Sequence, residues 1–201
     1  MNALFSIDPP FILASQSPRR RALLEHVNVS FRVQVSPADE HVEEPRSPAQ
    51  TARRLAARKA VPVAEAHPSA LVLAADTVVS HSDTLLGKPD SPTDATAMLK
   101  QLSGTTHAVH TGIALHHADT GRAVSADCET RVTFASLQAA EIEAYVATGS
   151  PMDKAGAYGI QDHTGPLFVK RLEGDYHNVV GLPLRCLYKT LRTHFDDLLH
   201  R

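Results

Sequence analysis

Apolar side chains fall into two kinds of pattern along the chain, and these predict strands and helices in mixed order. Residues 11–13 form an apolar run that indicates the end of a buried strand. Residues 31–35 alternate apolar and polar side chains, which predicts a half-buried strand. The stretch 70–79 is apolar and β-branched apart from its Asp-Thr pair, and it predicts a buried strand. Two further long strands, expected to pair as a hairpin, are 107–116 and 123–134, with the turn at 119–121.

Helices are expected between these strands, and they begin at Pro18, Pro48, Thr93, Ala139 and just after Gly181. Pro62 should kink or end the second helix, because proline removes a backbone donor. Ala97, Met98 and Leu102 should form the apolar side of the third. Helices mixed with strands predict an α/β or α+β fold around one central sheet. No linker or repeat interrupts the pattern, so we expect a single domain over residues 1–201.

The turn before the first helix joins a serine cap to three arginines. Ser17 is a natural helix cap, and Pro18 suits the first helical position. Arg20 stands where a capping box would place Glu or Gln, and Arg19 and Arg21 beside it are also basic. Cations near the positive end of a helix are unfavourable unless an anion binds there. The turn therefore predicts a phosphate site, and a solvated basic helix start that binds nothing is the alternative.

Helical spacing separates the three arginines. Arg20 shares a face with Leu24, so it should point toward the interior or the wall of a cleft. Arg21 should form an ion pair with Glu25, four residues on, in solvent. Arg19 lies at the mouth of the helix, between these two directions.

A second charged feature is Asp76, a carboxylate within an apolar strand. Its burial is costly unless a cation or a metal pairs with it. Cleavage of a triphosphate needs cations on the phosphates, carboxylates for a divalent metal and a group that orients or deprotonates water. Lys59, Lys88 and Glu40 add to Asp76 and the arginines the remaining parts of such a set. Taken singly, a structural buried Asp, two surface lysines and a solvated loop acid remain the alternatives.

The net charge, the apolar runs and the cysteines limit the classes of binding partner and the cellular location that we expect. A formal net charge of −2 over 201 residues gives no reason to expect nucleic acid or an acidic membrane surface as a partner. We recognise no signal peptide and no apolar run of membrane-spanning length. Cys128 and Cys186 lack metal-ligand spacing, so we expect a reduced, cytoplasmic protein. Most of the 12 histidines are expected at the surface.

Motifs for other phosphate chemistry are missing. The sequence has no GxxxxGK[ST] loop, no GxGxxG after a strand and no deaminase zinc pattern. Ser15 or Ser17 as a nucleophile would need a base partner, and none is evident. In contrast, the segment 149–181 holds six of the ten glycines, which suggests a backbone that passes close to a ligand.

Six short motifs follow one another along the chain: LASQSPRR at 13–20, AADT at 74–77, GKP at 87–89, LSG at 102–104, DKAGAYGIQ at 153–161 and YHNVVGLP at 176–183. In this order they resemble the Maf family of nucleoside triphosphate pyrophosphatases, over nearly the whole chain. The resemblance implies a mixed sheet flanked by helices, with two lobes and a deep cleft, similar to the inosine triphosphate pyrophosphatases. It also implies hydrolysis of a nucleoside triphosphate to the monophosphate and pyrophosphate, with Mg²⁺ or Mn²⁺ as cofactor.

The resemblance assigns roles to individual positions. Asp76 matches the proton acceptor that activates water for attack at the α-phosphorus, and Asp76 and Glu40 are the expected metal ligands. Arg19, Thr77 and Gln161 match positions that separate the substrate branches, and they look like the branch acting on dTTP and UTP. The amide of Gln161 can pair with the O4 and N3–H edge of a pyrimidine. The other expected substrate-binding residues are Ser15, Arg20, Lys59 and Lys88.

The resulting hypothesis is a cytoplasmic house-cleaning enzyme that hydrolyses dTTP, UTP and modified pyrimidine triphosphates, with a homodimer as a possible assembly. The alternatives are a 7-methyl-GTP pyrophosphatase of the same family, a non-catalytic nucleotide-binding regulator of cell division, and a scaffold domain. At 162–164 the chain carries Asp, His and Thr where the family usually has small residues.

Overall fold

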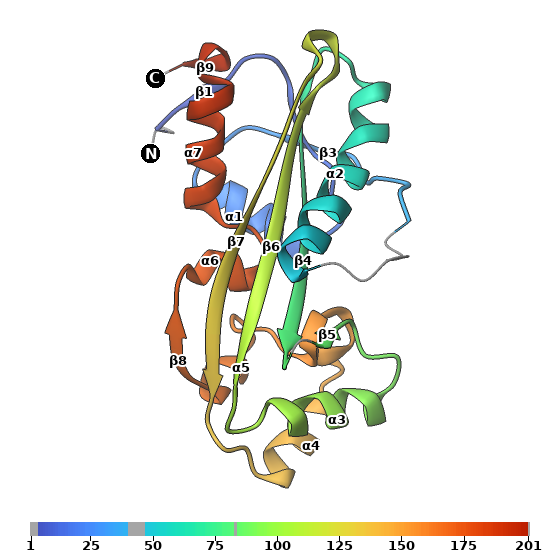
Figure 1. Cartoon of the computed structure of the whole chain (residues 1–201), viewed down its shortest axis with the longest axis vertical. Coiled ribbons are helices and arrows are strands. Elements are labelled where there is room, and N and C mark those ends of the chain that lie inside the picture. Colours follow the sequence, from blue (N-terminus) through green and yellow to red (C-terminus); the bar gives the residue numbers. More distant parts are fainter. Residues whose placement is uncertain (1–3, 40–46, 83, 201) are drawn as a thin grey trace.

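The computed structural model describes residues 4–39, 47–82 and 84–200, and it is built on a long mixed β-sheet (Figure 1). β2 runs parallel to β3 and β4, whereas β4, β6, β7 and β8 pair antiparallel. In sheet order the strands are β3 (Arg32–Val33), β2 (Phe11–Leu13), β4 (Leu71–His81), β6 (Thr106–His117), β7 (Arg122–Phe134) and β8 (Val169–Glu173), with β5 (Thr84–Leu86) paired to the end of β4.

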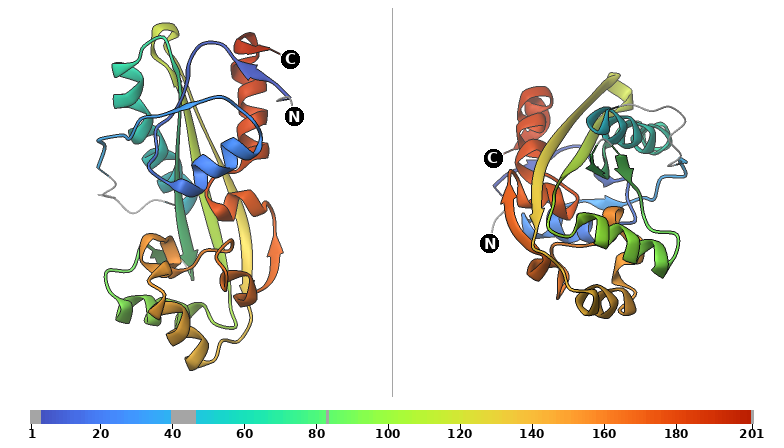
Figure 2. Two further views of the ribbon diagram at one scale, coloured as in Figure 1. Left: turned by 180° about the vertical axis from the view of Figure 1, so that it is seen from behind. Right: turned by 60° about the horizontal axis from the view of Figure 1, so that its bottom comes forward.

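Helices cover the sheet in two lobes, which the long strands β4, β6 and β7 connect (Figures 1 and 2). In the upper lobe α2 (Pro48–Ala66) lies on one face, and α1 (Pro18–His26) and α7 (Leu184–His194) lie on the other. The lower lobe holds α3 (Pro92–Leu102), α4 (Ala139–Ala147) and α5 (Gly165–Phe168), and α6 (Tyr176–Val180) lies between the lobes. The predicted fold class, a central mixed sheet flanked by helices in two lobes, is confirmed.

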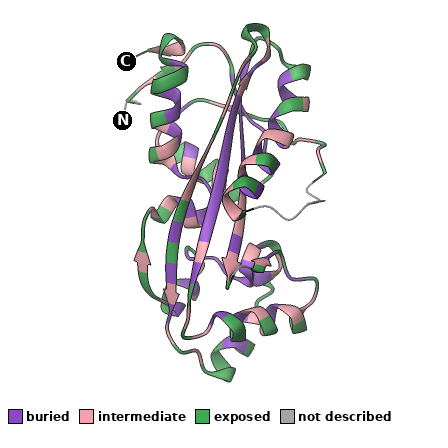
Figure 3. Cartoon of the chain, in the orientation of Figure 1, coloured by how far each residue is buried: buried purple, intermediate pink, exposed green. Residues whose placement is uncertain are grey.

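Alternate residues of β4 face different helices. Val72 and Ala74 pack in the core cluster under α2, whereas Leu73 and Ala75 pack in the cluster formed with α1 and α7. Successive side chains of a strand point to opposite faces, so Asp76 and Thr77, the next two residues of β4, also face opposite sides of the sheet. Figure 3 shows that the middle of the sheet is buried. The charged side chain at position 76 is therefore directed to the α2 face, and the hydroxyl at 77 to the α1 face.

Gly112 of β6 lies opposite Asp76 and sets how closely α2 approaches the sheet. A Cβ atom at this position would come within 2.3 Å of the backbone of Ala52 in α2. A glycine inside a strand commonly marks such a close backbone approach. Because α2 also carries Lys59, Gly112 helps to determine the distance between Lys59 and Asp76.

The ends of the described chain meet in a small second sheet. β1 (Ser6–Ile7) pairs antiparallel with β9 (Leu199–His200), so both ends lie beside α7 (Figure 1). The sequence patterns did not predict this pairing, nor β5, α5 and α6. Across the described residues, we find no helix whose length and apolar character would let it span a bilayer.

Two predicted elements differ from the structure. The strand expected at 31–35 is present but shorter, because only Arg32–Val33 forms a strand, and its expected half-burial is wrong, because both residues are exposed at the sheet edge. The second helix neither ends nor breaks at Pro62 but runs on to Ala66. Val63 and Ala64 are buried against the sheet, and this packing outweighs the lost backbone hydrogen bond.

The burial of some side chains also differs. Ala97 is exposed, and the buried face of α3 is formed by Ala95, Leu99 and Leu102. Most of the described histidines are not buried, as expected, but three histidines of β6, at positions 107, 110 and 117, are buried. Their burial follows from the position of β6 at the centre of the sheet, between β4 and β7.

Candidate active site

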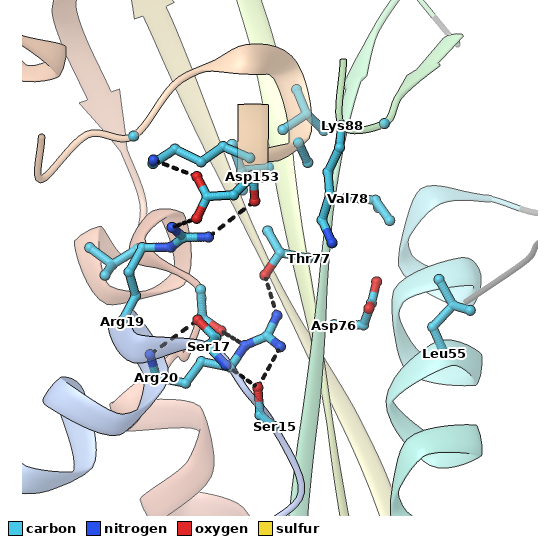
Figure 4. Close-up of a pocket in the computed structure, with 18 of the residues that line it drawn as sticks. Ser15, Ser17, Arg19, Arg20, Leu55, Asp76, Thr77, Val78, Lys88 and Asp153 are labelled. Carbon is cyan, nitrogen blue, oxygen red and sulfur yellow. Dashed lines mark hydrogen bonds and ion pairs between the residues drawn. The ribbon is translucent and has the colours of Figure 1, made fainter. Parts of the chain in front are cut away.

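A cavity of about 590 Å³ opens between the two lobes, within the size range of ligand pockets (Figure 4). Its walls come from the turn before α1, from α2, from the edge of β4, from the segments around residues 87–88 and 153–161, and from the end of α6 with Gly181. The eight described residues that the sequence placed in the site all line this one cavity: Ser15, Arg19, Arg20, Lys59, Asp76, Thr77, Lys88 and Gln161. Glu40, the other expected metal ligand, lies outside the described residues.

The cavity is centred on an open stretch of the edge of β4. β2 pairs with β4 up to Leu73, and β5 pairs from Val79 onward. Within the described chain, no strand pairs with this side of β4 between those two residues. Figure 4 shows Asp76 and Thr77 on opposite sides of this edge, so the cavity meets side chains from both faces of the sheet.

Asp76 forms a buried ion pair with Lys59. Lys59 Nζ lies 2.5 Å from Asp76 Oδ1, and the residues are 8% and 7% exposed. A buried carboxylate is costly unless it is paired, and Lys59 supplies the partner. Figure 4 shows the side chain of Lys88 extending past Thr77 toward the carboxyl group of Asp76. The site thus brings a carboxylate and two lysines to the same wall of the cavity.

Arg20 joins the three segments that frame the opposite wall. Its Nε donates to the carbonyl oxygen of Gly181 at 2.9 Å, and its two terminal nitrogens donate to Ser15 Oγ and Thr77 Oγ1, each at 3.3 Å. The rigid fork of a guanidinium group suits such a set of divergent acceptors. Arg20 therefore holds the serine turn against β4 and the end of α6, in addition to facing the cavity.

The serine turn itself has the predicted form. Ser17 caps α1 by accepting a hydrogen bond from the Arg20 backbone N–H, and Pro18 is the first helical residue. Ser15 Oγ accepts a hydrogen bond from the Ser17 backbone N–H at 3.2 Å. Arg21 pairs with Glu25 in solvent, as expected. The start of α1 thus presents its polar groups to the cavity, as a phosphate site requires.

Arg19 reaches across the cavity mouth to the other lobe, where its guanidinium lies 2.8 Å from the carboxylate of Asp153 (Figure 4). Partial burial raises the pKa of Asp153, but hydrogen bonds from Lys154 and Arg19 outweigh it and leave that pKa below its ordinary value. A phosphate bound at Arg19 would compete with this carboxylate. The sequence interpretation missed Asp153 as a partner, because the two residues are 134 positions apart.

Behind Gln161 lies a polar network that the sequence interpretation also missed. Asp162 accepts hydrogen bonds from the hydroxyl groups of Tyr145 and Ser150, both at 2.7 Å, and its carboxylate lies 3.4 Å from Lys154 Nζ. Gln161 is exposed at the cavity rim, and its amide nitrogen donates to Asp162 at 3.3 Å. Asp162 is one of three residues, at 162–164, where the family resemblance implies small residues. Its hydrogen bonds anchor the segment that carries Gln161 at the cavity rim.

Metal ligands are sparse in the described part of the chain. No group of three or more His, Cys, Asp or Glu side chains there is placed to hold a metal ion. Asp76 nevertheless offers the cavity a carboxylate, and Mg²⁺ is commonly held by one or two carboxylates together with substrate phosphates. The donor set therefore fits a metal that arrives with a phosphorylated ligand.

Comparison with known proteins agrees with this geometry. Residues 10–194 match the model of the family described as Maf-like protein. The chain is 58% identical to a dTTP/UTP pyrophosphatase of Salinibacter ruber, covering 99% of this chain and 98% of the relative. It is 51% identical to a protein of the same name from Geobacillus sp., covering 86% and 91%.

Among solved structures, a HAM1 protein from Coxiella burnetii matches with a TM-score of 0.41 and 18% identity, covering 64% of this chain and 74% of that one. We base no argument on this weaker likeness. The family match extends over most of the sequence, and the relatives align along nearly their whole length. This chain belongs to the Maf-like protein family.

Proposed function

We propose that this chain hydrolyses dTTP and UTP to the monophosphate and pyrophosphate. The observation that carries the proposal is the buried Asp76–Lys59 pair in the wall of a cavity that arginine and lysine side chains also line. Relatives of 58% and 51% identity that bear the name dTTP/UTP pyrophosphatase support the same reaction and substrates.

The residues that line the cavity take separate parts of the chemistry. Arg19 and Lys88 lie where cationic side chains can neutralise the phosphates, beside the positive N-terminal end of α1. Asp76 accepts the proton of the water that attacks the α-phosphorus. Lys59 holds the Asp76 carboxylate in place through their ion pair.

A divalent cation, Mg²⁺ or Mn²⁺, completes the proposed site. Asp76 is its proposed protein ligand among the described residues, and Glu40 is the second ligand that the family resemblance indicates. When bound, such an ion neutralises charge that develops on the phosphate oxygens during cleavage. The described residues hold no group of three or more such ligands, and Mg²⁺ is commonly held by one or two carboxylates together with substrate phosphates.

The preference for pyrimidine bases is proposed to reside at Arg19, Thr77 and Gln161. Gln161 stands at the rim with its amide held by Asp162, so its orientation is restricted before the nucleotide binds. An amide can match the O4 and N3–H edge that thymine and uracil share. Of the three residues, Gln161 is the one whose amide would contact this edge, and Asp162 supports it.

The remaining proposals concern the whole molecule. We propose one Maf-like domain over residues 1–201, acting in the cytoplasm on a nucleotide substrate, with a homodimer as a possible assembly and without nucleic acid as a partner. The sheet supports the single domain, since its strands range from Phe11 to Glu173. The net charge of −2 is consistent with a nucleotide rather than nucleic acid as ligand.

The test is product identification with a panel of triphosphates. Purified protein with UTP or dTTP and Mn²⁺ should release the monophosphate and pyrophosphate. Release of the diphosphate and orthophosphate would contradict the proposed bond cleavage. Faster turnover of 7-methyl-GTP would favour the other branch of the family, and tight binding without turnover would favour a regulator.

A further inference from the structure

The orientation of the buried amide of Asn178 can be assigned from its neighbours. Its side-chain nitrogen lies 3.0 Å from the carbonyl oxygen of Val109, which can only accept a hydrogen bond. Its side-chain oxygen lies 3.1 Å from the backbone nitrogen of Thr111, which can only donate. Asn178 is completely buried, so solvent offers no alternative partner. Only one of the two amide orientations satisfies both contacts.

The positions of two hydroxyl protons, those of Thr111 and Thr77, follow from the same comparison of donors and acceptors. Thr111 Oγ1 lies 2.9 Å from the carbonyl oxygen of Asn178 and 2.9 Å from Thr77 Oγ1. A carbonyl oxygen cannot donate, and a hydroxyl group has a single proton. The proton of Thr111 therefore points to Asn178, and the proton between the two threonines belongs to Thr77.

Toward the cavity, the hydroxyl group of Thr77 can therefore accept a hydrogen bond but cannot donate one. Its proton is directed at Thr111, and its oxygen also accepts a hydrogen bond from Arg20 Nη2 at 3.3 Å (Figure 4). Turning the proton into the cavity would leave two threonine oxygens 2.9 Å apart with no hydrogen between them. Because Thr111 is completely buried, water cannot replace that bond.

We propose that Thr77 accepts a hydrogen bond from an N–H or O–H of the nucleoside part of the substrate and does not bind a phosphate oxygen. Thr111 and Asn178 are positioning residues that fix this polarity. The substrate assignment rests on the proposed function. Two donors are common to dTTP and UTP and either one satisfies Thr77: the 3′-hydroxyl of the sugar, or the imide N3–H of the base, which Thr77 would then share with the amide of Gln161.

Substrate analogues distinguish these two donors. The kcat/KM of the wild-type chain and of Thr77→Val is measured with dTTP, with dTTP methylated at N3 and with dTTP lacking the 3′-hydroxyl. With one of the two analogues, the kcat/KM of the wild type should fall roughly fivefold to tenfold, mainly through KM, and that of Thr77→Val should fall much less. We call this difference between the two enzymes coupling to that analogue. Coupling to the N3 analogue identifies the base, and coupling to the sugar analogue identifies the hydroxyl. Equal losses in both enzymes for both analogues would overturn the proposal.

The positioning role has its own matched pair of variants. Thr111→Val removes only the hydroxyl, and the Asn178 carbonyl keeps a hydrogen bond from the Gly181 backbone N–H at 3.0 Å, so the fold should persist. In Thr111→Val the proton of Thr77 is released, so Thr77 can donate into the cavity as well as accept, and the analogue coupling should become weaker than in the wild type. Thr111→Ser should restore it. Coupling as large in Thr111→Val as in the wild type would contradict the role of Thr111.

Neutron diffraction of the unliganded full chain, exchanged into D₂O, tests the polarity without any substrate. Deuterium on Thr77 should point to Thr111, and deuterium on Thr111 should point to the Asn178 carbonyl. A Thr77 deuterium directed into the cavity would overturn the proposal even if dTTP and UTP are hydrolysed. The expected positions would stand even if neither nucleotide is a substrate.

Discussion

Lys59 Nζ lies 2.5 Å from Asp76 Oδ1, and each of the two side chains is 10% exposed. The pair joins α2 to β4 at the point where both line the cavity. A buried ion pair whose partner is removed leaves an uncompensated charge, whereas replacement of both partners can be nearly neutral. The stability and the activity of this protein should therefore respond differently to changes at the two positions.

Asp76→Asn should lower kcat by at least about a hundredfold, because an amide cannot take a proton from water. It should also lower the free energy of unfolding by about 3 kcal/mol, since Lys59 loses its buried partner. The double variant Lys59→Met with Asp76→Asn should recover most of the stability and none of the activity. Urea denaturation and steady-state kinetics measure the two quantities.

Two results would count against this account of Asp76. Normal turnover by Asp76→Asn would show that it is not the base. A double variant no more stable than Asp76→Asn alone would show that Lys59 is not stabilised through this carboxylate.

Arg20→Lys should lower the free energy of unfolding by about 1–2 kcal/mol, because an ammonium group cannot reach all three acceptors of the guanidinium fork. The same substitution at Arg21, which pairs with Glu25 in solvent, should change stability by less than about 0.5 kcal/mol. Thermal unfolding of the two variants side by side makes the comparison. Equal effects would show that Arg20 does not fasten the serine turn to β4.

Gln161→Glu should raise the KM for dTTP and UTP and erode the preference for pyrimidines in a triphosphate panel. A carboxylate at position 161 could no longer donate a hydrogen bond to O4 of the base. It would also repel Asp162, whose oxygen accepts the Gln161 amide N–H at 3.3 Å in the wild type. Since Gln161 is exposed, the melting temperature should change little. An unchanged substrate profile would remove Gln161 from the base-recognition site.

His107 should make the fold sensitive to acid. Burial, and to a lesser extent the nearby His81, lowers the pKa of His107 from 6.5 to about 4. Between these values the unfolded chain binds a proton that the folded chain does not. Stability should therefore be complete above pH 6.5 and fall as the pH drops toward 4, by about 3 kcal/mol in all, at about 1.4 kcal/mol per pKa unit.

The matched control for this pH dependence is His107→Gln. This variant keeps a group that can hydrogen-bond to the Tyr158 hydroxyl, which lies 2.7 Å from His107 Nε2, but it does not titrate. Urea unfolding at pH 7.5 and pH 4.5 should show a smaller difference for the variant than for the wild type. Identical differences would mean that His107 does not contribute to the acid sensitivity.

The sequence was most informative where a residue breaks a local rule. Asp76 in an apolar strand and basic residues at the start of a helix both stand out against propensity, and both line the cavity. Long strands and capped helices were also predictable, because their periodicity and caps are local signals. Among the described residues, every position singled out for the site lines that cavity.

Residues whose meaning depends on distant partners could not be found in this way. Thr111 and Asn178 are ordinary polar residues in the sequence, and only the pairing of β4 with β6 and the packing of α6 bring them behind Thr77. Asp153 contributes to the site because its carboxylate pairs with Arg19, which lies on the opposite lobe. The exposed strand β3 was misjudged because alternation alone does not reveal whether a second layer covers a sheet edge.

The central claim is that water, activated at Asp76, attacks the α-phosphorus. Hydrolysis of UTP in H₂¹⁸O, followed by mass spectrometry of the products, tests it most directly. The account predicts that the label enters UMP and that pyrophosphate stays unlabelled. Label in pyrophosphate, with unlabelled UMP, would place the attack at the β-phosphorus and contradict it.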